Sequence, residues 1–300
     1  MTSGLHVHTH NSSPRGGIVR TARRPEGWQA PGPLPAGNQD RDELWPAAGE
    51  DLCFLSGEWR IFQRLKGHRW SLDDLVTAWC ALETVRDVDV TRAMDLGCGI
   101  GSVLMMTAWR LPTTPCVGIE AQDVSVDLAR RSIAYNGIES HVHVRRGDLR
   151  DPSMTPEGPI YDLVTGTPPY IPIGHGSVSE HPQCGPCRHE FRGGIEDYCD
   201  AAARLMSPSG RFVTCAGGGQ TQRTETAAEA AGLQITRRRD IIPIEGRDCL
   251  FSVYSMVHDR REPGPLRLAC QVEEPLIVRD GSGARTPGYV HIREAMGMPP

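Results

Sequence analysis

Three glycines recur at every second position in the stretch from Asp95 to Gly101, which reads DLGCGIG. Glycine lets a backbone turn sharply and approach a ligand closely, and it leaves the amide groups of a following helix free to bind it. An apolar strand pattern precedes this stretch and a helical pattern follows it. Dinucleotide-binding loops place their third glycine three residues after the second, whereas the gap here is two, so the spacing favours a different ligand.

This loop, with an acid directly ahead of Leu96, resembles motif I of the class I S-adenosylmethionine-dependent methyltransferases. Two more acids agree with that resemblance, because Glu120 ends the second strand pattern and Asp148 the third. Carboxyl ends of neighbouring parallel strands converge on one crevice. There Glu120 can accept from both ribose hydroxyls and Asp148 from the adenine amine, while the resemblance places Asp95 near the methionine amino group. The predicted S-adenosylmethionine site therefore comprises Asp95, Gly97, Cys98, Gly99, Gly101, Glu120, Ala121, Asp148 and Leu149.

A second motif, Thr167-Pro168-Pro169-Tyr170, follows the fourth strand pattern. It resembles the (Asn/Asp/Ser)-Pro-Pro-(Tyr/Phe/Trp) corner of the same superfamily, which implies methylation of a planar amine. The first side chain and the Pro168 carbonyl can accept the two amine hydrogens, and the prolines fix the direction of that carbonyl. The Tyr170 ring can stack on the planar group. Thr167 departs from the usual asparagine, because it offers a single hydroxyl on a shorter stem, so a slower reaction or a different target is an open alternative.

Segments around these motifs resemble the bacterial tRNA adenine-N6 methyltransferases that modify the adenosine beside the valine tRNA anticodon. They include FLSGEWRIFQRLKGHRWSLDDLVTAWCAL before the glycine loop, CRHEFRGG after the corner and PLIVRDGSGARTPGYVHIREAMG near the end. The resemblance covers roughly residues 52 to 297 and implies transfer of a methyl group to adenine N6 in RNA, most simply tRNA. Basic side chains near the two motifs can bind phosphate; the predicted set is Arg64, Lys66, Arg69, Arg188 and His189.

Two alternatives remain open at this point. A protein-glutamine N5-methyltransferase of the release-factor type uses the same corner on a side-chain amide, although that family usually carries a helical domain of some seventy residues ahead of the core. A non-catalytic S-adenosylmethionine-binding interaction module is the second alternative, and Thr167 is its only support. A small-molecule acceptor is also compatible with the acidic pI of about 6.1.

The elements that would position these motifs alternate along the chain. A hairpin is expected near residues 53–63, followed by a helix that Ser71 caps. Strand patterns cover 91–96, 116–120, 142–148, 160–166, 211–216, 234–242 and 250–258, and helical patterns cover 102–111, 125–137, 196–210 and 221–232. This alternation predicts an α/β fold with a doubly wound, mostly parallel seven-stranded sheet and helices on both faces, the Rossmann-like methyltransferase fold.

Composition sets the remaining expectations. Residues 1–48 are rich in glycine and proline and lack apolar periodicity, so we expect a disordered tail, with a methyltransferase domain over 49–300 that includes the hairpin-helix and a C-terminal extension. The net charge of −5 excludes a wholly basic nucleic-acid coat, and no apolar run could span a membrane. Ten scattered cysteines indicate a reducing compartment, most simply the cytoplasm, although the arginine-bearing N-terminus leaves a mitochondrial or plastid location open. The Cys184/Cys187 pair alone is a weak metal signal, so no metal is expected. Nothing indicates the oligomeric state.

Overall fold

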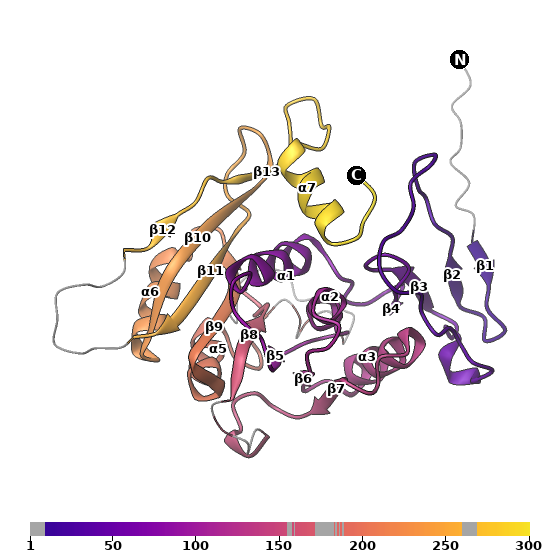
Figure 1. Cartoon of the computed structure of the whole chain (residues 1–300), viewed down its shortest axis with the longest axis horizontal. Helices are drawn as coiled ribbons and strands as arrows, with labels where there is room; N and C mark the ends of the chain where they lie inside the picture. Colours follow the sequence, from indigo (N-terminus) through magenta and orange to yellow (C-terminus); the bar gives the residue numbers. More distant parts are fainter. Residues whose placement is uncertain are drawn as a thin grey trace.

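The computed structural model describes residues 10–154, 158, 160–171, 183, 185, 187, 189–259 and 269–300. Their main feature is a nine-stranded sheet in the order β12-β10-β11-β9-β8-β5-β6-β7, with β13 pairing with β10 (Figure 1). Its strands are β5 (Ala93–Leu96), β6 (Cys116–Glu120), β7 (Val142–Arg146), β8 (Tyr161–Gly166), β9 (Met206–Gly217), β10 (Leu233–Ile244), β11 (Phe251–His258), β12 (Gln271–Val272) and β13 (Leu276–Arg279).

The predicted doubly wound fold is confirmed. Strands β7, β6, β5, β8 and β9 are parallel, and β11 runs antiparallel between β9 and β10. The seven expected strands are therefore present, and the structure adds β12 and β13, which are short and lie beyond β10. One helix is shorter than expected: the segment 196–210 leaves the helix after Leu205, since Met206 already pairs with Tyr161 and Pro208 cannot continue a helix.

Helices pack on both faces of the sheet. The helices are α1 (Leu72–Thr84), α2 (Ser102–Arg110), α3 (Asp123–Asn136), α5 (Ile195–Leu205), α6 (Thr221–Ala230) and α7 (Pro287–Ala295), with short 3-10 turns η1 (Asp42–Leu44) and η2 (Pro152–Met154). Side chains of α1, α2, α3 and α7 share one buried apolar cluster with the sheet, and those of α5 and α6 share the other. Burial of apolar surface on both faces is what a parallel sheet requires. None of the helices in the described part of the chain has the length and apolar character needed to cross a membrane.

Register brings the motifs to one edge of the sheet. Leu96 at the end of β5 pairs with Ile119 of β6 and with Gly166 of β8. The glycine loop, Glu120 and the Pro-Pro corner therefore begin at the same level, because each directly follows one of these paired residues. Carboxyl ends of parallel strands at such a point of reversed strand order are where open α/β sheets bind ligands.

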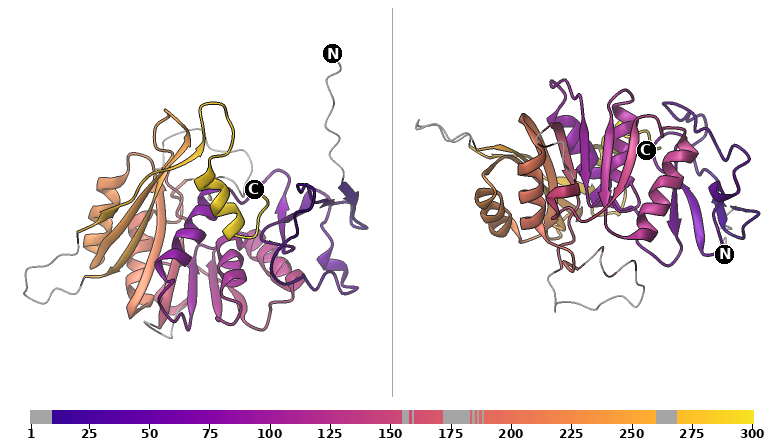
Figure 2. Two further views of the ribbon diagram at one scale, coloured as in Figure 1. Left: turned by 45° about the horizontal axis from the view of Figure 1, so that its top comes forward. Right: turned by 90° about the horizontal axis from the view of Figure 1, so that it is seen from below.

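The N-terminal residues form a second, small sheet. Strands β1 (His10–Ser12), β2 (Ile18–Arg20), β3 (Glu50–Phe54) and β4 (Arg60–Arg64) pair in that order. Strands β3 and β4 are the predicted antiparallel hairpin. Figure 2 shows the small sheet at one end of the molecule and strands β10 and β11 at the other. Since residues 10–48 contribute two of these strands, the expectation of a disordered tail is wrong for them; residues 1–9 lie outside the described residues.

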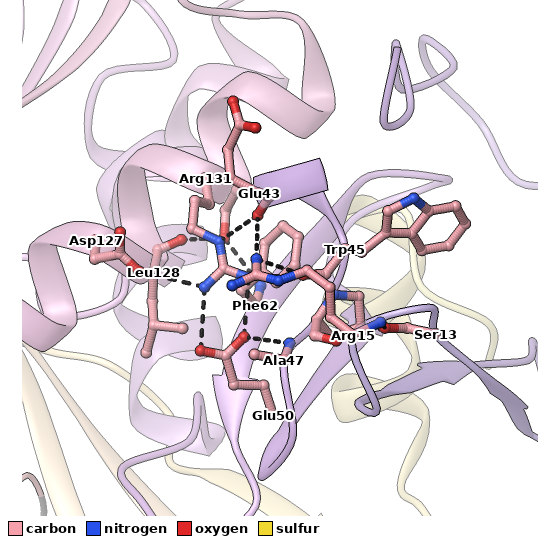
Figure 3. A network of polar contacts seen from close by, with 12 residues as sticks. Ser13, Arg15, Glu43, Trp45, Ala47, Glu50, Phe62, Asp127, Leu128 and Arg131 are labelled. Carbon is pink, nitrogen blue, oxygen red and sulfur yellow. Dashed lines mark hydrogen bonds and ion pairs between the residues drawn. The ribbon is translucent and has the colours of Figure 1, made fainter. Parts of the chain in front are cut away.

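A buried arginine of α3 explains why this segment is ordered (Figure 3). Arg131 donates from Nε to the Glu43 carbonyl at 2.7 Å and from Nη2 to the Trp45 carbonyl at 3.0 Å. It also forms a bidentate pair with Glu50, at 3.1 and 2.9 Å. From the other side, Arg15 donates to the same two carbonyls at 3.2 Å. These bonds satisfy backbone groups of a segment that has no helix of its own beyond one turn.

Candidate active site

A cavity of about 520 Å³ opens at the carboxyl edge of the main sheet. Its walls come from the loops after β5, β6, β7 and β8, from the start of α1 and from the segment before α5. The residues that line it are Gly67, His68, Arg69, Ser71, Asp73, Asp74, Gly97, Cys98, Gly99, Ile100, Ser102, Ile119, Glu120, Ala121, Gln122, Gly147, Asp148, Leu149, Thr167, Pro168, Pro169, Tyr170, Ile171, Cys187, Arg192, Gly193 and Tyr198. The two predicted motifs thus face one space.

The three glycines of the loop serve three different purposes. Gly97 has φ 57°, and a Cβ added there would overlap the hydroxyl of Tyr198 and lie 3.0 Å from its Cζ. Gly99 also has a positive φ, but its missing side chain faces open space, which leaves its backbone accessible to a ligand. Gly101 is the N-cap of α2 and does not line the cavity; a Cβ added to it would lie 3.3 Å from the Cβ of Ala129. Only the first two therefore line the site.

Glu120 ties the first two strand ends together. Its Oε2 accepts from the Gly99 amide at 3.0 Å and its Oε1 accepts from the Gln122 amide at 2.6 Å. The side chain is buried, and burial raises the pKa of this carboxyl, although the two amide donors partly oppose that shift. A buried carboxylate held in this way has a fixed direction and keeps lone pairs free for hydroxyl donors.

Asp148 lies in a more exposed position. Its carboxylate accepts from Arg150 Nε at 2.9 Å and from Arg150 Nη2 at 2.6 Å. These hydrogen bonds are the main reason that the pKa of Asp148 is lowered. Arg150 therefore shares the carboxylate that sequence reasoning assigned to an adenine amine.

Asp95 lies beneath the loop rather than on the cavity wall. Its Oδ1 accepts from the Thr165 hydroxyl at 2.8 Å, and the Leu104 amide near the start of α2 also acts on this carboxylate and lowers its pKa. Its Oδ2 is buried and lacks a partner at hydrogen-bond geometry among the described residues. Burial raises the pKa of Asp95 to about 7. An orphaned buried carboxylate oxygen next to a ligand cavity is costly unless a bound group supplies a donor or a positive charge.

The start of α1 adds residues that sequence reasoning did not assign to the site. Ser71 and Asp74 form the predicted helix cap, in which the Ser71 amide donates to Asp74 Oδ2 at 2.9 Å. Both of them and Asp73 also line the cavity. Asp74 is buried, and burial followed by the proximity of Asp73 raises its pKa well above the usual range. Capping alone was a sufficient reason for acids at these positions, so no signal in the sequence pointed to a second role.

The Pro-Pro corner leaves β8 and forms the opposite wall. Thr167, Pro168, Pro169 and Tyr170 all line the cavity. The Tyr170 ring lies against the end of β9, since a Cβ added to Gly217 would sit 3.0 Å from Tyr170 Cδ2. A bulkier residue than glycine there would push the ring away.

The predicted phosphate-binding residues are only partly brought to the site. Arg69 lines the cavity, but its guanidinium pairs with the fully buried Asp51 at 2.8 and 3.1 Å. Arg64 and Lys66 are exposed and do not line the cavity. His189 is a correction: its ring is 1% exposed and stacks on Phe191, so it is not presented to an external phosphate.

The loop beyond the corner is described only in part. Arg188 and Cys184 lie outside the described residues. Arg192 lines the cavity, and sequence reasoning missed it. Cys187 also lines the cavity, and its sulfur accepts from Gln122 Nε2 at 3.4 Å. Among the described residues, no group of three or more His, Cys, Asp or Glu side chains could hold a metal ion.

This fold, with its glycine loop and its acids on successive strand ends, places the chain among the class I S-adenosylmethionine-dependent methyltransferases. The comparisons with known proteins agree. The family model described as "Methyltransferase small domain" matches residues 77–177. A tRNA1(Val) (adenine(37)-N6)-methyltransferase of Porphyromonas gingivalis is 23% identical over 226 residues, covering 73% of this chain and 84% of that protein.

Two further similarities bear on substrate and fold. A release factor glutamine methyltransferase of Aliivibrio fischeri is 30% identical over 153 residues, covering 45% of this chain and 50% of that protein. A crystal structure of a predicted O-methyltransferase from Agrobacterium tumefaciens superposes with a TM-score of 0.56 at 19% identity, covering 76% of this chain and 98% of that one. The structural likeness concerns the fold, and the sequence relatives differ in what they methylate.

The cavity fits S-adenosylmethionine as cofactor. When bound, this cofactor supplies an electrophilic methyl group on a sulfonium centre. Gly97 and Gly99 would offer backbone to it, Glu120 and Asp148 would accept from its hydroxyl and amine donors, and the orphaned oxygen of Asp95 would gain a cationic partner. The chain's own contribution is to hold these acceptors at fixed positions before the cofactor arrives.

The different burial of the two strand-end acids leads to a test. We expect Glu120→Gln to weaken S-adenosylmethionine binding roughly 10- to 100-fold, because hydrogen bonds to a buried charged acceptor contribute about 1.5–3 kcal/mol each. Asp148→Asn should lower the affinity for S-adenosylmethionine by no more than about threefold, since a partly exposed carboxylate already paired with an arginine contributes little. Isothermal titration calorimetry measures both constants. A larger loss for Asp148→Asn than for Glu120→Gln would contradict this ranking.

Proposed function

We propose that this methyltransferase transfers a methyl group to a planar exocyclic amine, the N6 of adenine in RNA. The observation that carries the proposal is the position of the Thr167–Tyr170 corner, which faces the glycine loop across a single cavity. In this proposal the Thr167 hydroxyl and the Pro168 carbonyl accept the two amine hydrogens. The nitrogen lone pair then points away from them, and Tyr170 stacks on the ring.

Methyl transfer to such an amine requires little acid–base catalysis by the protein. An amine conjugated to a ring has its lone pair delocalised, so orientation towards the methyl group is the main requirement. The prolines keep the Pro168 carbonyl in one direction because their rings fix φ. A stacked base gains roughly 1–3 kcal/mol from an aromatic side chain.

RNA is supported by two observations. The similarity to the tRNA1(Val) methyltransferase extends over 73% of this chain, whereas that to the release factor glutamine methyltransferase extends over 45%. Arg192 lines the cavity, where its positive charge also acts to lower the pKa values of Glu120 and Asp148, and in this proposal its guanidinium contacts a phosphate of the RNA. Exposed Arg64 and Lys66 both precede the cavity residue Gly67 and would extend such a contact.

A protein glutamine is the second candidate acceptor. A side-chain amide is also planar and carries an NH₂ group, so the same corner suits it, and identity to the glutamine methyltransferase is 30% in the region that matches. The two candidates differ in what the rest of the cavity must contact: a phosphate-bearing nucleotide in one case and a peptide in the other.

The experiment uses radiolabelled S-adenosylmethionine with either small RNA from cells that lack this protein or a purified release factor. We expect label in RNA, recovered as N6-methyladenosine in nucleoside mass spectrometry. Label in the release factor alone would replace the first proposal with the second. Cofactor binding without transfer to either, or to small-molecule amines, would favour a non-catalytic interaction module.

Two substitutions of Thr167, one that removes the hydroxyl and one that lengthens the acceptor, test this proposal. We expect Thr167→Val, which keeps the shape and removes the hydroxyl, to lower kcat about 10-fold or more, in line with about 1–3 kcal/mol for a lost acceptor in a buried site. Thr167→Asn should retain or raise kcat, because a carboxamide oxygen reaches farther towards the amine. Unchanged kcat in Thr167→Val would remove this side chain from the reaction.

A further inference from the structure

The first turn of α6 lies against the Pro-Pro corner. Gln220, which directly precedes α6, donates from Nε2 to the carbonyl of Tyr170 at 2.8 Å. Its own backbone is fixed on both sides: its amide donates to the Gly217 carbonyl at 3.1 Å and its carbonyl accepts from the Thr224 amide at 3.0 Å. A side chain mounted on such a backbone is a rigid support for the peptide that carries the Tyr170 ring.

One turn later, Arg223 provides a second support. It forms a bidentate pair with Glu190 at 2.7 and 2.9 Å and pairs with Glu196 at 2.7 Å. The Glu190 side chain is 12% exposed and that of Glu196 is 50% exposed, so the first pair is the more shielded. Bidentate arginine–carboxylate pairs fix geometry as well as contributing energy.

Glu190 transmits this support to the corner. Its amide donates to the Ile171 carbonyl at 3.1 Å, and His189 pairs with Ile171 as an isolated parallel bridge. Arg192 and Gly193, which line the cavity, follow two and three residues later. The carbonyls of Tyr170 and Ile171 are thus both held by groups that lead back to α6, beyond the end of the β8 ladder.

We infer that Gln220 and Arg223 are positioning residues for the acceptor, which fix the Tyr170 ring and the peptide after it in the orientation that methyl transfer requires. The inference rests on the proposed function, because it takes the corner to be the acceptor site. The prolines fix residues 168 and 169, but no strand holds residues 170 and 171, so other contacts must do so. A shift of about 1 Å at such a position can cost about 100-fold in rate.

Two carboxylates on one arginine offer a matched test. Glu190→Gln and Glu196→Gln each remove one negative charge facing Arg223, yet only Glu190 is bonded to the corner. We expect the rate of amide hydrogen exchange at residue 190 to be at least about 10-fold higher in Glu190→Gln than in wild type, measured on the full-length protein with S-adenosylhomocysteine. It should stay within about twofold in Glu196→Gln. Equal exchange in the two variants would overturn the inference.

An activity measurement separates positioning from folding. Gln220→Glu replaces the donor by an acceptor of the same size, and Gln222→Glu makes the same charge change at an exposed site two residues later, in the first turn of α6. With RNA as acceptor we expect Gln220→Glu to lower kcat about 10-fold or more, with S-adenosylhomocysteine affinity within about twofold of wild type. Gln222→Glu should behave as wild type.

The outcomes of the two measurements are distinct. Parallel loss of cofactor affinity and thermal stability in Gln220→Glu would mean a purely structural role and would overturn the inference. If the wild-type protein transfers no methyl group to RNA, the proposed function fails, and the exchange comparison between Glu190→Gln and Glu196→Gln still decides whether α6 holds the corner.

Discussion

Gly97→Ala should lower the affinity for S-adenosylmethionine by at least about 100-fold, which corresponds to about 2.7 kcal/mol. The new Cβ would overlap the Tyr198 hydroxyl and would sit at φ 57°, a region that costs a non-glycine residue about 1–2 kcal/mol. Tyr198 cannot move away easily, because it is buried and its ring already fills the space above Gly166. The loop must therefore shift, and with it the backbone that the cofactor would contact.

Two further variants identify the cause. Gly99→Ala carries a similar backbone cost at φ 55° but meets no atom of the protein, so its thermal stability should fall less than that of Gly97→Ala. Tyr198→Phe removes the overlapping hydroxyl, and in the Gly97→Ala background it should restore part of the lost stability. Thermal unfolding and titration calorimetry give both readouts. Gly97→Ala binding within about threefold of wild type would refute the steric account.

Seven of the nine strands of the main sheet were predictable because each carries a local signal, whereas the short β12 and β13 were not predicted. The Cys116–Glu120 strand has the predicted bounds, and α1 begins directly after Ser71, as the serine followed by acids indicated. Hydrophobic periodicity and helix-capping motifs depend only on residues that are close together in the sequence. The positions of the glycine loop and of Glu120 follow from strand ends alone, so the sequence pattern was enough to place both at the carboxyl edge of the sheet.

The N-terminal segment was not predictable for the opposite reason. It is held by Arg131, whose partners Glu43 and Trp45 are 88 and 86 residues away in the sequence. Hydrogen bonds from a side chain to backbone carbonyls do not require a periodic pattern of apolar residues in the segment that they hold. A glycine- and proline-rich segment without such a pattern was therefore expected to be unstructured. Disorder judged from composition fails where a distant side chain supplies the missing hydrogen bonds.

Contacts between residues far apart in the sequence also explain the errors in the predicted active site. Arg69 and His189 were chosen for their side-chain type, but Asp51 binds the first and the second is buried. Exposure of a loop residue depends on contacts that sequence spacing does not encode. Asp74 shows the converse case: its role in capping accounted for its presence, and its place in the cavity emerged only from the packing of α1.

S-adenosylmethionine affinity should depend on pH through Asp95. Burial raises the pKa of this carboxyl to about 7 from a usual 3.8, so at pH 6 most of the cofactor-free protein carries it protonated. We propose that this carboxylate, although it lies beneath the glycine loop, is the partner of the methionine ammonium in the bound state, so only its ionised form is competent. Affinity should then rise about 10-fold per pH unit below pH 7 and level off above it.

The Asp95→Asn variant isolates the contribution of Asp95 to the pH dependence of S-adenosylmethionine affinity. The variant should bind S-adenosylmethionine at least about 100-fold more weakly at pH 8, and its affinity should lose most of the pH dependence, because no charge is left to pair with the ammonium. Asp148→Asn is the control: the pKa of Asp148 is lowered, so it stays ionised over this range and the slope should be unchanged.

The same substitution should stabilise the cofactor-free protein. Between about pH 4 and pH 7 the folded state keeps a proton on Asp95 that the unfolded state has released, so this group's contribution to stability falls as pH rises through that window. The asparagine of the Asp95→Asn variant does not titrate, and the gain over wild type in the free energy of unfolding should grow with pH to at most about 4 kcal/mol near pH 8. Denaturant unfolding at pH 5 and pH 8 measures the difference. A variant less stable than wild type at pH 8 would mean that the buried carboxylate is already neutralised by the protein itself, and the cofactor's ammonium would then need another partner.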